Sequence, residues 1–306
     1  MLRAGGTIGP AATLTHVGPP VSQPFGSADP VESQNIESIE VGDAGGVPDT
    51  VAFVDGIQRY AVEARIGVEP IVRGYAAAAV VKRVAGELVV VDQATDEFLV
   101  AALSRLTEEQ RAILSGVGLR MVDSGAQDRA HPIVDVRQAA LVVERRRDQL
   151  ETALIERHLG QRADTWLVVD GSISKVAKSF EDTDARILGL IKSHETQFLE
   201  GADLQVAVTL PFGHRTSVFR RGILPHGSVF SWYLRLWPWE ERELLYGLVR
   251  IERPPTEATV ATASQVSRWM LAERAPLSAP DGRWDRLFYP IQQVETYLRA
   301  QLGSWW

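Results

Sequence analysis

The chain of 306 residues contains no cysteine. This absence excludes disulfide bonds, thiolate zinc sites and cysteine nucleophiles, and it is compatible with the reducing cytoplasm, where we expect the protein to work. The six histidines do not pair at the spacing of metal ligands, so a zinc site is not expected either.

Long hydrophobic runs are also missing. The most apolar stretch, "GYAAAAVV", is far shorter than the ~20 residues that a membrane-spanning helix needs. The first residues, "MLRAGGTIGP", lack the apolar centre of a signal peptide. We therefore expect neither secretion nor insertion into a membrane.

Positive charge is scarce, with 32 Lys and Arg against 39 Asp and Glu and a formal net charge of -7. Proteins that hold nucleic acid over a broad surface are usually basic, so this balance argues against such a surface. It does not exclude a nuclease, whose metal site is itself acidic. No Gly-rich phosphate loop with a Lys-Ser/Thr ending is present, so the chain is not expected to hydrolyse ATP itself.

The composition changes near residue 50. Residues 1–49 are rich in Gly, Pro, Ser and Thr, which predicts a flexible, low-complexity N-terminal arm. Residues 50–306 alternate between strand and helix patterns, which indicates one mixed α/β domain. The alanine run and "ARILGLIKSHETQFL" fit either type. Strands are predicted for "VAFVDG", "IQRYAVEARI", "YAAAAVVKRV", "GELVVVDQ", "TWLVVDG", "LQVAVTLPF", "SVFSWYLRLW" and "YGLVRIE", and helices for "TEEQRAILSGVG", "DVRQAALVVERRRDQLETALIERHLG", "VATASQVSRWMLAERA" and "YPIQQVETYLRAQL".

The sequence Val-Asp-Gly closes two of the apolar strand patterns, at Asp55 and at Asp170. A strand holds a carboxylate rigidly, and hard cations such as Mg²⁺ and Mn²⁺ take oxygen ligands. The two aspartates could therefore share a metal site, although Asp-Gly is also a common turn dipeptide. Glu144 and Glu151, seven residues apart on one face of the long helix pattern, are candidates for a third acid or for a solvated helix face.

Several motifs in order resemble the NurA nucleases: "VDGIQR", a helix with Glu, "LVVDGSIS", "LGLIKSH", "SWYLRL", "GLVRIE" and "DRLFYPIQQVE". The resemblance covers residues 51–302. It implies an RNase H-like core and a manganese-dependent nuclease (Mn²⁺, or Mg²⁺) acting on DNA. It also implies a HerA-type hexameric ATPase as partner, a role in end resection, recombination and repair, and a homodimer.

The resemblance also assigns residues. Asp55 and Asp170 match the two metal-binding aspartates, and Glu151, with Glu144 in reserve, matches the helical glutamate. Tyr289 matches the tyrosine at the start of the last helix, and Lys192 matches a cation that would hold the scissile phosphate.

This chain departs from many relatives in two places. It has Asp55-Gly56-Ile57 instead of "DGS", and it has no histidine about two turns beyond Tyr289. Tyr297 stands near that position, and Glu295 would supply a fourth carboxylate or simply pair with Arg299 at i+4. The missing histidine and the acidic composition keep one alternative open, a catalytically weak or inactive adaptor that docks on the ATPase and on DNA. A nuclease acting on RNA is a further alternative, which a comparison of substrates would separate. The basic runs Arg145–Arg147 and Arg220–Arg221 suit either phosphate contacts or solvated surface.

Overall fold

The computed structural model describes residues 25–84, 87–126, 129–161, 164–180, 185–222, 227–239, 242, 244–274, 286 and 288–302. The first 24 residues of the predicted arm, and the turn predicted at Gly86, lie outside the described residues.

Five strands form the centre of the fold. Strands β3 (Val51–Ile66), β4 (Glu69–Val84) and β5 (Glu87–Ala101) make an antiparallel meander. On the other side of β3 lies β7 (Trp166–Asp170), which is parallel to β3, and then β8 (Ile187–Ile191), which is parallel to β7. The strand order is β5-β4-β3-β7-β8. Strands β3, β4 and β5 are antiparallel to one another in turn, and β7 and β8 run parallel to β3, which is the arrangement of an RNase H-like core. The predicted mixed α/β, RNase H-like fold is confirmed.

The sheet continues on both sides of this core and has twelve strands among the described residues. Antiparallel neighbours extend it beyond β8, and β6 pairs in parallel with β5 at the far edge. The added strands are β12 (Leu248–Arg253), β11 (Ser228–Arg235), β10 (Phe219–Gly222), β9 (His214–Thr216), β6 (Arg120–Asp123), β1 (Ala28–Pro30) and β2 (Ser38–Glu40).

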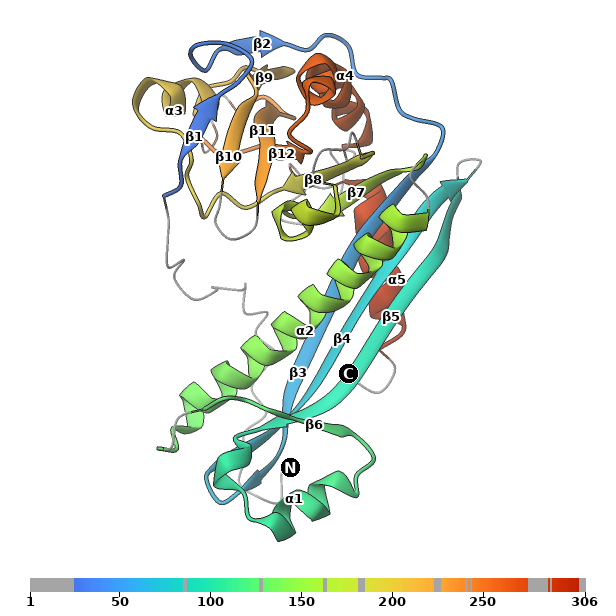
Figure 1. Ribbon diagram of the computed structural model, residues 1–306, viewed down its shortest axis with the longest axis vertical. Helices are drawn as coiled ribbons and strands as arrows, with labels where there is room; N and C mark the ends of the chain where they lie inside the picture. Colours follow the sequence, from blue (N-terminus) through green and yellow to red (C-terminus); the bar gives the residue numbers. More distant parts are fainter. Residues whose placement is uncertain are drawn as a thin grey trace.

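Helices cover both faces of the sheet (Figure 1). Helix α2 (Pro132–Gln161) packs on one face, against even-numbered residues of β3 and β4 such as Val54 and Ala78. Helices α4 (Glu257–Glu273) and α5 (Tyr289–Ala300) pack on the other face, which carries odd-numbered residues such as Phe53. Because successive side chains of a strand alternate between faces, the alanine-rich β4 is a strand buried on both sides and not a helix.

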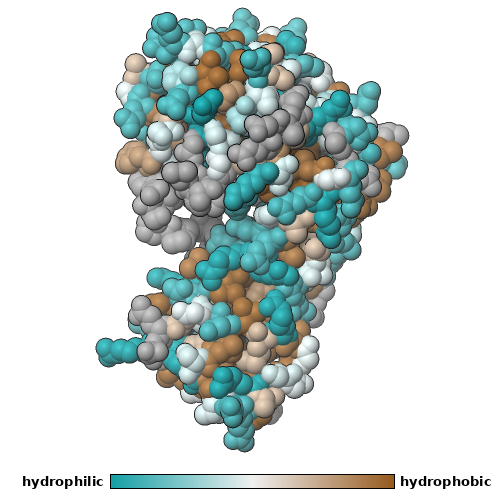
Figure 2. All heavy atoms as spheres, viewed as in Figure 1, coloured by the Kyte–Doolittle hydropathy of each residue, from teal (hydrophilic) through white to brown (hydrophobic). Residues whose placement is uncertain are grey.

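Strands β3 to β5 run well past the end of β7 and form an arm below the upper body (Figure 1). At its tip lie β6, the short helix η2 (Leu103–Arg105) and α1 (Glu108–Ser115), which begins at a capping box formed by Thr107, as predicted. Figure 2 shows hydrophobic residues exposed on this arm. The large exposed ones near the tip are Val68, Ile113, Val117, Ile133 and Val134.

Three predicted elements differ from the structure. Residues 51–66 form one continuous strand and not two, because β4 pairs with β3 along its whole length. The pattern "LQVAVTLPF" contributes to helix α3 (Gly201–Val208), where Leu204 and Ala207 share one stripe that packs on a small separate core. Residues 25–49, which the composition assigned to a flexible arm, contain β1 and β2, which pair with β10 and β9.

Among the described residues, no helix is long and apolar enough to cross a membrane.

Candidate metal-binding active site

Asp55 and Asp170 lie side by side on neighbouring parallel strands. The register of β3 and β7 pairs Val54 with Val169, so the next position on each strand carries an aspartate. Adjacent strands are about 4.8 Å apart, and paired positions point to the same face. The two carboxylates therefore meet, as the repeated Val-Asp-Gly pattern led us to expect.

Glycine serves different purposes in the two Asp-Gly dipeptides. A Cβ atom on Gly56 would lie 2.4 Å from Oε1 of Glu151 and 3.0 Å from the carbonyl oxygen of Ala77, so glycine is required there by close packing in the middle of β3. Gly171 has a φ of +123° and turns the chain out of β7, a conformation that favours glycine. The prediction of a strand end is therefore wrong at the first dipeptide and right at the second.

Helix α2 brings Glu151 to the two aspartates. Leu150 and Leu154 pack on small residues of β3 and β4, which fixes the rotation of the helix and turns Glu151 toward the sheet, with its side chain 18% exposed. Glu144 lies seven residues earlier, about 10 Å along the helix, and does not line the cavity at the two aspartates. The structure thus places Glu151, and not Glu144, beside them.

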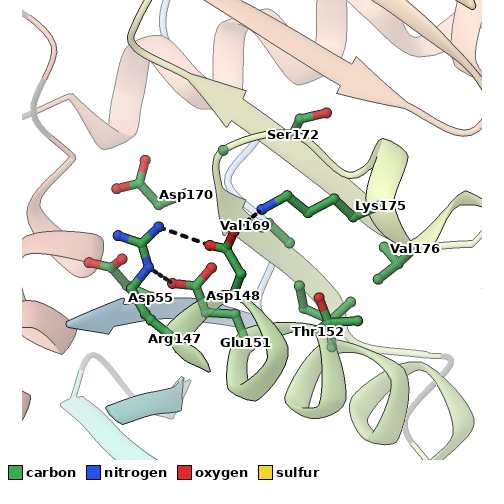
Figure 3. A pocket seen from close by; sticks show the side chains of 12 residues that line it. Asp55, Arg147, Asp148, Glu151, Thr152, Val169, Asp170, Ser172, Lys175 and Val176 are labelled. Carbon is green, nitrogen blue, oxygen red and sulfur yellow. Dashed lines mark hydrogen bonds and ion pairs between the residues drawn. The ribbon is translucent and has the colours of Figure 1, made fainter. Parts of the chain in front are cut away.

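These acids open into a cavity of about 250 Å³. Figure 3 shows the guanidinium of Arg147 among the carboxylates that come from β3, β7 and α2. The cavity is lined by Asp55, Arg147, Asp148, Glu151, Thr152, Ile155, Val169, Asp170, Gly171, Ser172, Lys175 and Val176.

A chain of ion pairs runs through this cavity. Nε of Arg147 lies 3.3 Å from Oε1 of Glu151, and its other end donates a 2.9 Å hydrogen bond to Asp148. Asp148 in turn contacts Nζ of Lys175 at 2.9 Å, and Lys175 belongs to the short helix η3 (Ser174–Ser179) that follows β7. Burial works against the charge of Arg147, but the carboxylates of Glu151 and Asp148 outweigh it and raise the pKa of the guanidinium.

Asp170 also borders a second cavity, of about 200 Å³, on the side of α5. There its Oδ1 lies 2.8 Å from Nζ of Lys192. Glu295 lines the same cavity and also accepts hydrogen bonds from Arg299 at 3.0 and 2.5 Å. Glu295 therefore makes the expected pair with Arg299 and also lines the space beside Asp170, and its role as a fourth acid stays a prediction.

The electrostatics of the first cavity favour an added cation. Burial raises the pKa of Glu151 to about 7 despite the opposing charges of Arg147 and Lys175, and the charges of Asp148 and Asp170 add to the rise. Burial and the charge of Asp170 also raise the pKa of Asp55 well above its usual value. Raised carboxylate pKa values show that the surroundings favour the neutral acids over the carboxylate anions, and a divalent ion would add stabilising positive charge.

The donors fit a hard cation by type, but they are not gathered around one point. Within the part of the chain that the structure describes, no three His, Asp or Glu side chains are grouped closely enough to hold a metal ion as they stand. Asp170 is held by Lys192, and Glu151 is held by Arg147. Asp55, Asp170 and Glu151 would therefore hold an ion only after Glu151 turns from Arg147 toward the aspartates.

Two tyrosines of the last helix, Tyr289 and Tyr297, lie away from the acids. Tyr289 is 53% exposed at the start of α5 and lines neither cavity. The hydroxyl of Tyr297 donates a 2.7 Å hydrogen bond to Gln93 of β5. Tyr297 therefore does not take a place beside Asp170 in the way that a metal-binding histidine would.

A buried ionic cluster supports the turn after Asp170. Ser172 donates a 2.7 Å hydrogen bond to Glu252, whose other oxygen pairs with Arg221 and Arg250. Glu252 is fully buried. Arg221, which the sequence offered as a surface cation, is thus a structural residue that fixes the exit from β7.

Sequence reasoning missed the roles of Arg147, Asp148 and Lys175 at the cavity. The sequence predicts only that the run Arg145–Arg147 is a basic patch. Successive helical residues point about 100° apart, so Arg146 pairs with Asp96 of β5 while Arg147 reaches the site. The signal that could have separated them is the i,i+4 spacing of Arg147 and Glu151.

No protein-family model matches this chain, and no curated protein sequence matches it. The solved structures that are similar to it include two nucleases. The NurA nuclease from Sulfolobus solfataricus is 10% identical, with 85% of this chain and 81% of that chain covered and a TM-score of 0.49. The catalytic domain of human Endonuclease V is 14% identical, with 83% and 84% covered and a TM-score of 0.32. The first bears the name of the family that the sequence motifs resemble.

Proposed function

We propose that the chain is a metal-dependent nuclease that hydrolyses phosphodiester bonds of DNA. One observation carries the proposal: two aspartates on adjacent parallel strands and a glutamate from the packed helix α2 face one polar cavity. Asp55, Asp170 and Glu151 would hold Mn²⁺ or Mg²⁺. A bound ion of this kind supplies a nucleophile at neutral pH and offsets negative charge on the phosphate.

The remaining groups have roles that follow from their positions. Lys192, beside Asp170 at the mouth of the second cavity, would contact the scissile phosphate and orient it. Glu295, across the same cavity, would act as a fourth acid once it parts from Arg299. Tyr289, exposed at the start of α5, would contact the substrate strand.

The test is cleavage of labelled single- and double-stranded DNA in Mn²⁺ by the protein and by its Asp55→Asn and Asp170→Asn variants. Asp92→Asn is the matched control, because Asp92 pairs with Arg157 and lines neither cavity. Both site variants should lose at least a hundredfold in rate, a usual consequence of losing a group that stabilises the transition state. Cleavage that survives both substitutions would place the activity elsewhere. An RNA of the same sequence serves as the competing substrate.

The finer parts of the proposal rest on the resemblance of the sequence motifs. They are the preference for Mn²⁺, a homodimer, a cytoplasmic location, partnership with a HerA-type hexameric ATPase, and work in end resection during recombination and repair. A cognate ATPase should form a complex with the chain and raise its rate of cleavage. Light scattering on the purified protein tests the dimer.

One observation favours a second candidate, a catalytically weak adaptor that docks on the ATPase and on DNA. Glu151 and Asp170 already have cationic partners in Arg147 and Lys192, and Tyr297 points to Gln93 instead of the site. An adaptor would bind no Mn²⁺ and would cleave neither DNA nor RNA, with or without the ATPase.

A further inference from the structure

Arg147 lies at the centre of the proposed site although no role in catalysis requires it. Its side chain crosses β3 so closely that a Cβ on Gly56 would come within 3.0 Å of its Cγ. From there the guanidinium lies among the carboxylates of the cavity (Figure 3). The charge of Arg147 thus stands where a metal ion would have to neutralise the same acids.

The contacts of Arg147 are unequal in quality. One end donates a 2.9 Å hydrogen bond to Asp148. Its Nε group lies 3.3 Å from Glu151 but makes no hydrogen bond among the described residues, and the atom is buried. The pair with Glu151 is therefore a loose ion pair, and a buried N–H group without a hydrogen bond costs free energy that a better acceptor would recover.

A metal ion and Arg147 would compete for one carboxylate. Asp55, Asp170 and Glu151 are not gathered around one point as they stand, so Glu151 would have to move from its pair with Arg147 to join the two aspartates around an ion. Once Glu151 turns away, the planar guanidinium of Arg147 is left beside a site that holds a cation, with N–H groups that have no acceptor. Two parallel N–H groups of a guanidinium match the oxygens of a phosphate.

We propose that Arg147 is a metal-released phosphate ligand: it holds Glu151 while the site has no metal, and metal binding frees it to bind a backbone phosphate of the nucleic acid. This inference rests on the proposed function. It makes substrate binding follow metal binding, because the arginine becomes available only after Glu151 leaves it. Arg147 is then a substrate-binding residue, and Asp148, itself paired with Lys175, holds its other end in place.

The first measurement is Mn²⁺ binding to the nucleic-acid-free protein by electron paramagnetic resonance. Arg147→Gln removes the competing charge and should bind Mn²⁺ about tenfold more tightly than the unsubstituted protein. Arg147→Lys keeps the charge and should stay within about threefold of it. Arg146→Gln is the matched control, because Arg146 is the next residue on α2 and pairs with Asp96 away from the cavity.

The second measurement is the affinity for a labelled DNA oligonucleotide, by fluorescence anisotropy in EDTA and in Ca²⁺. In EDTA the Arg147→Gln variant should match the unsubstituted protein. In Ca²⁺ it should bind about tenfold more weakly, the loss of one charge-assisted phosphate contact. Arg146→Gln should lose little in both buffers.

Unchanged or weaker Mn²⁺ binding by Arg147→Gln, or an equal loss of DNA affinity in EDTA and Ca²⁺, would overturn the inference and leave a plain helix ion pair. That outcome would not touch the proposed function, which the aspartate variants test. If the unsubstituted protein binds no Mn²⁺ at all, the proposed function fails, and the inference fails with it.

Discussion

Replacing Gly56 with alanine should displace Glu151 from the cavity at little cost in stability. The new Cβ would lie 2.4 Å from Oε1 of Glu151, where ordinary contact begins at 3.4 Å, so the carboxylate must move by about 1 Å. Misplacement of that size can lower the rate of an enzyme about a hundredfold. Because Glu151 must take up a new position beside Asp55 and Asp170 to hold an ion, the added methyl group should alter the Mn²⁺ affinity of Gly56→Ala and lower its DNA cleavage.

The stability of this variant should change much less. Overpacking typically costs about 1–3 kcal/mol, here against the carbonyl oxygen of Ala77 at 3.0 Å. Alanine in place of glycine inside a strand recovers about 0.5–1 kcal/mol. The net loss, measured by urea denaturation in EDTA, should be about 1 kcal/mol.

Two control variants test whether the effect of Gly56→Ala comes from the displacement of Glu151. Gly160→Ala, on α2 with no atom within 4 Å of the new Cβ, should leave cleavage unchanged and gain up to ~1 kcal/mol of helix stability. In a Glu151→Ala background, the further change of Gly56 should have little additional effect on metal binding, because the group that it displaces is gone. The reasoning is refuted if Gly56→Ala alone keeps normal Mn²⁺ affinity and cleavage.

Three further predictions concern pH, the buried cluster and the last helix. The pKa of Glu151 is raised from 4.5 to about 7, so the metal-free protein should lose stability as pH rises through this window. Mn²⁺ affinity should rise over the same window, and Glu151→Gln should weaken both dependences in denaturation and binding titrations, leaving the part that the raised pKa of Asp55 contributes. Glu252→Gln leaves two buried arginines without their counter-charge and should lower the free energy of unfolding by about 3–5 kcal/mol; a loss below 1 kcal/mol would contradict the cluster's structural role. Tyr297→Phe removes only the hydrogen bond to Gln93, so cleavage should persist, with about 1 kcal/mol of stability lost in thermal melts.

The sequence was sufficient to predict that Asp55 and Asp170 lie together, but not to predict which other residues surround them. Asp55 and Asp170 could be found because each follows an apolar run, a pattern that local chain geometry explains. Glu151 could be narrowed only to one of two residues on a helix face, since the choice depends on how far α2 slides along β3. That position is set by packing between residues about 100 positions apart in the chain.

The wrong predictions also concern features that are set by packing between distant parts of the chain. "VAFVDGIQRY" contains a plausible turn at Gly56, and only pairing with β4 shows that the strand continues. The alternating pattern around Leu204 suits a strand, but packing against Phe198 and Leu210 selects a helix. Arg145, Arg146 and Arg147 are alike in sequence, and only the helix's orientation over the sheet separates them.

Strand β3 is longer than its neighbour β7, so its two halves are held by different numbers of partner strands. Up to Val54 the strand has hydrogen-bonded partners on both sides, in β4 and β7, whereas from Asp55 to Ile66 its described partner is β4 alone. Amide hydrogens should therefore exchange with solvent slowly before Asp55 and faster beyond it. Asp55 therefore lies at the boundary between a part of β3 that is held on both sides and a part that is held on one side, where we expect the backbone to move more readily than at the centre of the fold.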